Sequence, residues 1–153
     1  MYKDIFTKKL NKSNVILTIL SLIISLSWAI KLDREWGFDF GIYYTAAAFF
    51  SDNYELYKEH LEIKGPVYYA FLFILGKIIG FGPLQAIISL FLTAYLFVST
   101  VLYISNKYTK SFLKKLFYIL LCGSILFYQT TNASISVFQL SLLLLSFHYL
   151  YEQ

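Results

Sequence analysis

The chain has 153 residues, of which 58% are hydrophobic, 20% aromatic and only 14% charged, and its formal net charge is +4 at pH 7. A typical soluble domain carries about 25% charged residues, so this composition excludes an ordinary soluble enzyme and predicts an all-α polytopic membrane protein with one membrane domain over residues 1–153. A helical span needs roughly 20 apolar residues to cross about 30 Å of hydrocarbon, so the uncharged runs of the sequence locate the predicted spans.

The first predicted span covers residues 14–30, an uncharged run that follows a lysine-rich start. Under the positive-inside rule, the four lysines Lys3, Lys8, Lys9 and Lys12 place this start in the cytoplasm. The alternative is a signal peptide, in which the last three of these lysines form the charged region and Ser27-Trp28-Ala29 is a small-x-small cleavage site. The apolar character of the rest of the chain favours a retained span.

Residues 31–65 form a predicted external loop, which carries more acidic than basic residues. Residues 40–50 are predicted to form a short interfacial helix, with Tyr43 and Tyr44 at the level of the lipid headgroups. Residues 54–63 combine charged and apolar positions in a pattern that predicts a short amphipathic helix or turn on the membrane.

The second predicted span, residues 66–80, is short. Its apolar part has about 14 residues and would reach only about 21 Å, and it contains Lys77. We interpret it as a short, tilted or re-entrant span, with Lys77 reaching toward the cytoplasmic face. The segment at 84–104 is longer and uncharged, and the segments at 112–128 and 134–151 are two more predicted spans joined by a polar turn.

The lysines that follow the 84–104 segment conflict with a topology in which every segment crosses. In that topology they would lie outside, against the positive-inside rule. A re-entrant 66–80 segment would return them to the cytoplasm, and a weak lysine bias would leave them as an exception; the sequence favours neither. The lysines in conflict are Lys107, Lys110, Lys114 and Lys115.

The surplus positive charge predicts contact with anionic lipid headgroups, because Lys8, Lys9 and Lys12 flank the first predicted span. No nucleic-acid-binding module is recognisable.

Asp39 is the main candidate for chemistry, because it places a carboxylate in a polar loop beside predicted membrane spans. A carboxylate at the bilayer rim can act as a general base and remove the proton from an acceptor hydroxyl during sugar transfer. The alternative is a solvated loop carboxylate, or an N-cap for a helix that starts at Phe40.

Other polar residues are weaker candidates. Arg34 and Lys64 flank the loop and either hold a lipid phosphate or snorkel at helix ends. Gln139 lies in an apolar helix and is expected to face other helices, where its amide finds a hydrogen-bond partner. Cys122 is the only cysteine, which excludes an internal disulfide and a cysteine metal site. The histidines and carboxylates form no recognised metal pattern, so neither a metal nor another cofactor is predicted.

The order of these features resembles the amino-terminal half of the family 87 (DUF2029-type) glycosyltransferases of the GT-C superfamily. In that family a loop Asp is the presumed catalytic base, a Tyr-Pro-Pro-Leu-like motif opens the second span, and a Gly-Gln pair lines a later helix. Here Pro66 and Val67 match only part of the second motif, and Phe138 replaces the Gly before Gln139. The features that carry the resemblance are, in order, Asp39, Tyr43, Tyr44, Asn53, Leu56-Tyr57, Gly65-Pro66-Val67-Tyr68 and Gln139.

The resemblance implies an enzyme of the bacterial plasma membrane that transfers a sugar, such as mannose, from a polyprenyl-phosphate donor to a lipid or glycan acceptor. Asp39 would be its base, with Tyr43, Tyr44, Arg34, Lys64 and Gln139 as substrate contacts. Members of that family carry many more spans, so the chain resembles half an enzyme, and a chain complete at this length would need a partner subunit. The rival hypothesis is a small non-enzymatic membrane protein, either an accessory subunit or a scaffold.

Overall fold

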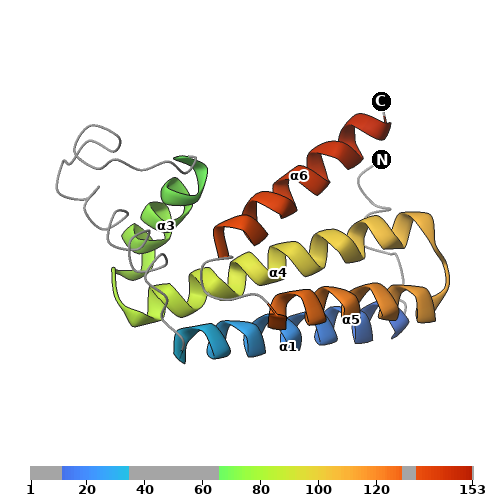
Figure 1. Cartoon of the computed structure of the whole chain (residues 1–153), viewed down its shortest axis with the longest axis horizontal. Helices are drawn as coiled ribbons and strands as arrows, with labels where there is room; N and C mark the ends of the chain where they lie inside the picture. Colours follow the sequence, from blue (N-terminus) through green and yellow to red (C-terminus); the bar gives the residue numbers. More distant parts are fainter. Residues whose placement is uncertain (1–11, 35–65, 129–133, 153) are drawn as a thin grey trace, which may run out of the picture.

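The computed structural model describes residues 12–34, 66–128 and 134–152, and nearly all of them are helical (Figure 1). No strand occurs in these ranges, which confirms the all-α prediction. Each helix lies within a few residues of a predicted segment. The helices are α1 (Lys12–Arg34), α3 (Pro66–Ile79), α4 (Pro83–Tyr108), α5 (Phe112–Tyr128) and α6 (Ser134–Glu152).

Two of these helices are long and apolar enough to cross a membrane: α4, and α1 over Lys12–Lys31. The apolar stretches of α3 and α6 are shorter, at Val67–Ile79 and Ser136–Tyr151. In α5, which has 17 residues, two lysines stand in the first turn. Length and composition therefore support two spans among the described residues.

The link between α3 and α4 is tight because of its glycines. Gly80 has a φ of 84°, in the left-handed region that favours glycine. Its N–H donates to the carbonyl oxygen of Gly76 at 2.8 Å, which ends α3 in the manner of an αL cap. A Cβ at Gly76 would run into the ring of Phe81, so glycine there lets this ring lie against α3. Pro83 then starts α4, where its missing N–H costs no helical hydrogen bond.

The long helix α4 is the centre of the fold and packs against α1, α5, α6 and α3. The buried side of α1 combines small polar and large residues. The hydroxyls of Ser21 and Ser25 are buried and donate to the carbonyl oxygens of Leu17 and Ser21, both at 2.8 Å. Small residues that satisfy their own hydroxyls let helix backbones approach closely, as at helix interfaces in membranes. Trp28 and Ala29 complete this side of α1 and are fully buried.

The outer surface of the helices is strongly apolar. Contiguous exposed apolar surface marks a site of contact with a membrane or another protein. Exposed apolar side chains occur on several helices, so the outside of the described part is apolar. Some polar side chains are buried inside it. Exposed large residues include Ile16, Ile19, Ile23 and Leu26 of α1, Ile74 and Ile78 of α3, Leu113, Phe117 and Leu120 of α5, and Leu143, Phe147 and Leu150 of α6.

Two contacts show that α1 and α5 run in the same direction. Near the ends of both helices, Nζ of Lys31 donates to the carbonyl oxygen of Phe127 at 2.8 Å. About two turns earlier in α1 and one turn earlier in α5, a Cβ built on Gly123 lies 3.3 Å from Cδ1 of Ile24. Because a short turn connects α4 to α5, α4 runs opposite to both (Figure 1).

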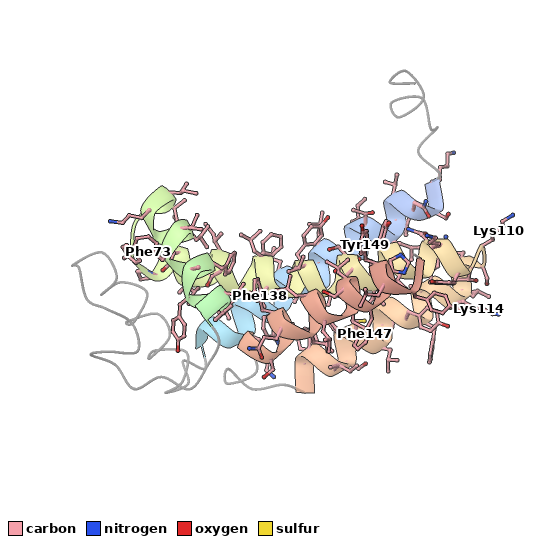
Figure 2. All side chains as sticks on the ribbon, turned by 90° about the horizontal axis from the view of Figure 1, so that it is seen from above. Phe73, Lys110, Lys114, Phe138, Phe147 and Tyr149 are labelled. Atoms are coloured by element: carbon pink, nitrogen blue, oxygen red, sulfur yellow. The ribbon has the colours of Figure 1, made fainter. Side chains whose placement is uncertain are left out.

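The parallel arrangement brings the start of α1 and the α4–α5 turn to one end of the bundle, as Figure 1 shows. This end is called the lysine end. Figure 2 shows Lys110 and Lys114 there, pointing away from the helices. Its described lysines are Lys12, Lys107, Lys110, Lys114 and Lys115.

Helix α3 lies entirely at the opposite end, beside the start of α4 (Figures 1 and 2). It is held there by Gln85, which is fully buried and whose Nε2 donates to the carbonyl oxygen of Leu72 at 2.8 Å. A helix α3 that crossed from one end to the other would have made α1 and α5 antiparallel. The prediction that Lys77 reaches toward the same side as the amino-terminal lysines is wrong, because the last turn of α3 adjoins the start of α4 at the other end.

This arrangement predicts the outcome of cysteine labelling in intact membrane vesicles. In a Cys122→Ser background, single cysteines at Lys12 and Lys110 should react with an impermeant reagent from the same side, and one at Lys77 from the other. All three lysines are exposed, so access depends only on sidedness. If α3 crossed fully, Lys12 and Lys110 would label from opposite sides, which would contradict the parallel packing.

Candidate functional site

Most of the predicted site residues lie outside the part of the chain that the structure describes. This holds for Asp39, Tyr43, Tyr44 and Lys64. Arg34 is the last residue of α1, and its side chain also lies outside the described part. Gln139 is therefore the predicted site residue that the structure places.

The two helices that bracket residues 35–65 meet at one end of the bundle. Helix α1 finishes at Arg34, and α3 begins at Pro66, both toward the end opposite the lysine end (Figure 1). The segment that contains Asp39 is therefore attached to the described helices at this end, where α3 and the start of α6 also lie.

A groove of about 310 Å³ lies between α3 and the first half of α6. It is called the α3–α6 groove. Val67 and Tyr68 line it from α3, directly after Pro66, and Phe138 and Gln139 line it from α6. Two motifs about 70 residues apart in the sequence therefore share one groove. The other lining residues are Leu142, Leu143 and Ser146.

Three aromatic rings at the base of the groove join α3 to α6. The ring centroids of Tyr68 and Phe138 are 5.3 Å apart, and those of Phe71 and Phe138 are 5.2 Å apart at an interplanar angle of 25°. Tyr68 and Phe138 are buried. Offset aromatic pairs at such separations add about 0.5–1.5 kcal/mol beyond the area that they bury. Phe138 therefore supplies the ring through which α6 contacts α3.

The polar groups of the groove are few. The side chain of Gln139 is exposed, so the prediction that it faces neighbouring helices is wrong, and it lies on the open side of the groove instead. The hydroxyl of Ser146 donates to the carbonyl oxygen of Leu142 in its own helix at 2.9 Å. A mostly apolar groove with an amide on its open side suits an elongated apolar chain that ends in a polar group.

No acid or base for catalysis lines the α3–α6 groove. All Asp and Glu side chains of the sequence lie outside the described side chains, which cover residues 12–31, 67–127 and 136–151. Within the same ranges, no group of three His, Cys, Asp or Glu residues is placed to hold a metal ion. Cys122 is a buried free thiol on α5. A catalytic carboxylate would have to come from Asp4, Asp33, Glu152 or the acidic residues of 35–65.

Comparisons with known proteins give no match: no protein-family model, no curated protein and no solved structure resembles the chain significantly. The groove residues that sequence analysis did not single out are Leu142, Leu143 and Ser146. They lie three, four and seven residues after Gln139 and so share a helix face with it, and this spacing is the signal that points to them.

Proposed function

We propose that the chain is the membrane-embedded, amino-terminal part of a glycosyltransferase that uses a polyprenyl-phosphate sugar donor. One observation carries the proposal: the α3–α6 groove is lined by both described motifs of the resemblance, Val67-Tyr68 and Phe138-Gln139. Chance similarity in an aromatic-rich sequence gives no reason for these motifs to meet. The segment with Asp39 begins and ends on helices at the same end of the bundle.

A multi-pass position in the plasma membrane agrees with the surface of the described helices. Large aliphatic and aromatic side chains cover their outside, whereas serines, threonines and Gln85 are buried between them. In lipid the outer residues need no further cover, and the buried small residues allow close packing. With the start of α1 in the cytoplasm, α3 is a re-entrant helix on the outer side, and residues 35–65 lie on that side as well.

In the proposed reaction, the groove binds the donor and the loop supplies the general base. The α3–α6 groove holds the isoprenoid chain of the donor, and Arg34 and Lys64 bind its phosphate. The acceptor hydroxyl oxygen attacks the anomeric carbon of the sugar, and the bond between that carbon and the phosphate oxygen breaks. Asp39 takes the proton of the hydroxyl as a general base, while Tyr43 and Tyr44 line the site.

The second candidate is a non-enzymatic accessory subunit or scaffold in the membrane. The two candidates differ in what the groove does, because a scaffold has no use for an open groove that accepts a lipid chain.

Filling the groove tests the proposal. Ser146→Trp in the product of the complete gene should lower sugar transfer from a polyprenyl-phosphate donor by roughly 100-fold, because a misplaced reacting group costs about that much. Ser124→Trp is the matched control, since Ser124 is also exposed and its hydroxyl also donates to the carbonyl oxygen four residues earlier, at 3.0 Å. Equal transfer by the two variants would contradict the role of the groove, and absence of transfer by the wild type would favour the scaffold.

A further inference from the structure

We propose that the lysine end binds the headgroups of anionic phospholipids, and that this contact fixes the protein in the membrane. The proposal does not depend on glycosyl transfer. It rests on three features of the described residues: the gathering of the lysines, the surroundings of these side chains, and the order of residue types along the helices.

Packing of distant segments creates the cluster. Lys107 ends α4, Lys110 lies in the turn, and Lys114 and Lys115 open α5. The parallel packing of α1 against α5 adds Lys12. The lysine end thus contains five of the seven described lysines. Of the other two, Lys31 donates to the carbonyl oxygen of Phe127, and Lys77 lies over the ring of Phe73 at 5.4 Å from its centroid.

Four of the five side chains of the lysine end are exposed, all except Lys115. Lys12, Lys110 and Lys114 are exposed, and Figure 2 shows the latter two pointing outward. Lys115 is only 8% exposed, so its aliphatic stem packs among the helices. Exposed lysines thus gather at this end, and such a gathering favours an anionic partner.

The order of residue types identifies that partner as a lipid leaflet. Tyr108 ends α4 and Tyr151 lies in the last turn of α6, and both are exposed close to the lysines. Further along α5 than its two lysines, the exposed large residues are apolar, such as Phe117 and Leu120. The sequence of lysine, tyrosine and aliphatic side chains matches the headgroup, interfacial and hydrocarbon layers of a membrane. A nucleic acid or acidic protein would not require the apolar layer.

Each lysine near an anionic membrane surface contributes a roughly 5-fold preference for anionic lipid. Removal of two exposed lysines should therefore lower that preference by about 25-fold. The Debye length falls from about 10 Å at 0.1 M salt to about 3 Å at 1 M, so high salt should also weaken the preference.

The test is native mass spectrometry of the protein released from membranes of mixed phosphatidylcholine and phosphatidylglycerol. We expect the wild type to retain phosphatidylglycerol in preference to phosphatidylcholine, and Lys110→Gln/Lys114→Gln to lose most of that preference. Lys77→Gln is the matched control: it removes an exposed lysine at the opposite end and should behave as the wild type within about 2-fold, below the effect of one headgroup lysine.

Two outcomes would overturn the proposal. One is a double variant that retains phosphatidylglycerol as strongly as the wild type. The other is an equal loss in the double variant and in Lys77→Gln, which would show that total charge and not the lysine end determines lipid binding. Both substituted lysines are exposed, so these variants keep the helix packing, and circular dichroism checks that they do.

Discussion

Replacing Asp39 with asparagine should lower sugar transfer by about 10²–10⁴-fold, the usual contribution of a general base. Asparagine keeps the size of the side chain and most of its capacity to cap a helix, but it cannot accept a proton. The variant should therefore be produced and folded as the wild type is. Transfer of radiolabelled sugar from a polyprenyl-phosphate donor, with the product of the complete gene in membranes, measures the effect.

Two neighbouring carboxylates serve as controls for this variant. Asp33→Asn and Asp52→Asn remove the same charge from the same stretch of sequence and should change the rate little. If all three variants lose activity equally, loop charge and not proton transfer is responsible. If Asp39→Asn transfers sugar at nearly the wild-type rate, the base is another group, and a wild type that is inactive with any partner would favour an accessory or scaffold role.

The positions of the helices could be predicted from the sequence because they depend on local features. Uncharged runs give the lengths, Pro66 and Pro83 open two helices, and Gly80 ends one. Each of these signals acts within a few residues. The same reasoning correctly predicted two helices, α5 and α6, within one long uncharged run, because polar residues interrupt that run.

The direction of α3 could not be predicted, because it is set by contacts between residues far apart in the chain. The packing of Lys31 against Phe127 and of Ile24 against Gly123 joins positions more than 90 residues apart. The periodicity of either segment does not indicate which residues form these contacts. Charge patterning left open both a re-entrant segment and a lysine-bias exception, whereas the parallel direction of α1 and α5 brings the start of α1 and the α4–α5 turn to one end of the bundle.

The groove was predictable only in part. The resemblance singled out Pro66, Val67 and Gln139, but it treated Phe138 as a departure that weakened the site. The structure shows that Phe138 stacks on Phe71 and packs on Tyr68, so the departure has a packing role. The orientation of Gln139 was predicted wrongly because α6 is apolar around most of its circumference, and such a helix gives little sign of which face is buried.

Burial in α1 is opposite to what side-chain hydrophobicity alone would indicate, since Ser21 and Ser25 are buried while Leu22 and Leu26 are exposed. In water the leucines would turn inward. The arrangement is reasonable where the surroundings are as apolar as the leucines, because packing then depends on shape and close backbone approach. The stability of this helix should consequently depend on its few large buried residues.

Trp28→Ala should therefore destabilise the protein by about 3–5 kcal/mol, the range for large-to-small changes at buried aromatic positions. Trp28 is fully buried in the core shared with α4, and its indole N–H makes no hydrogen bond within the described part of the chain, so the cost arises from lost packing. Leu26→Ala is the control on the same helix, because Leu26 is 48% exposed and should cost well under 1 kcal/mol in detergent, as surface substitutions usually do. Equilibrium unfolding in mixed micelles, followed by far-ultraviolet circular dichroism, measures both. Equal destabilisation by the two substitutions would show that α1 does not bury its serine and tryptophan face against α4.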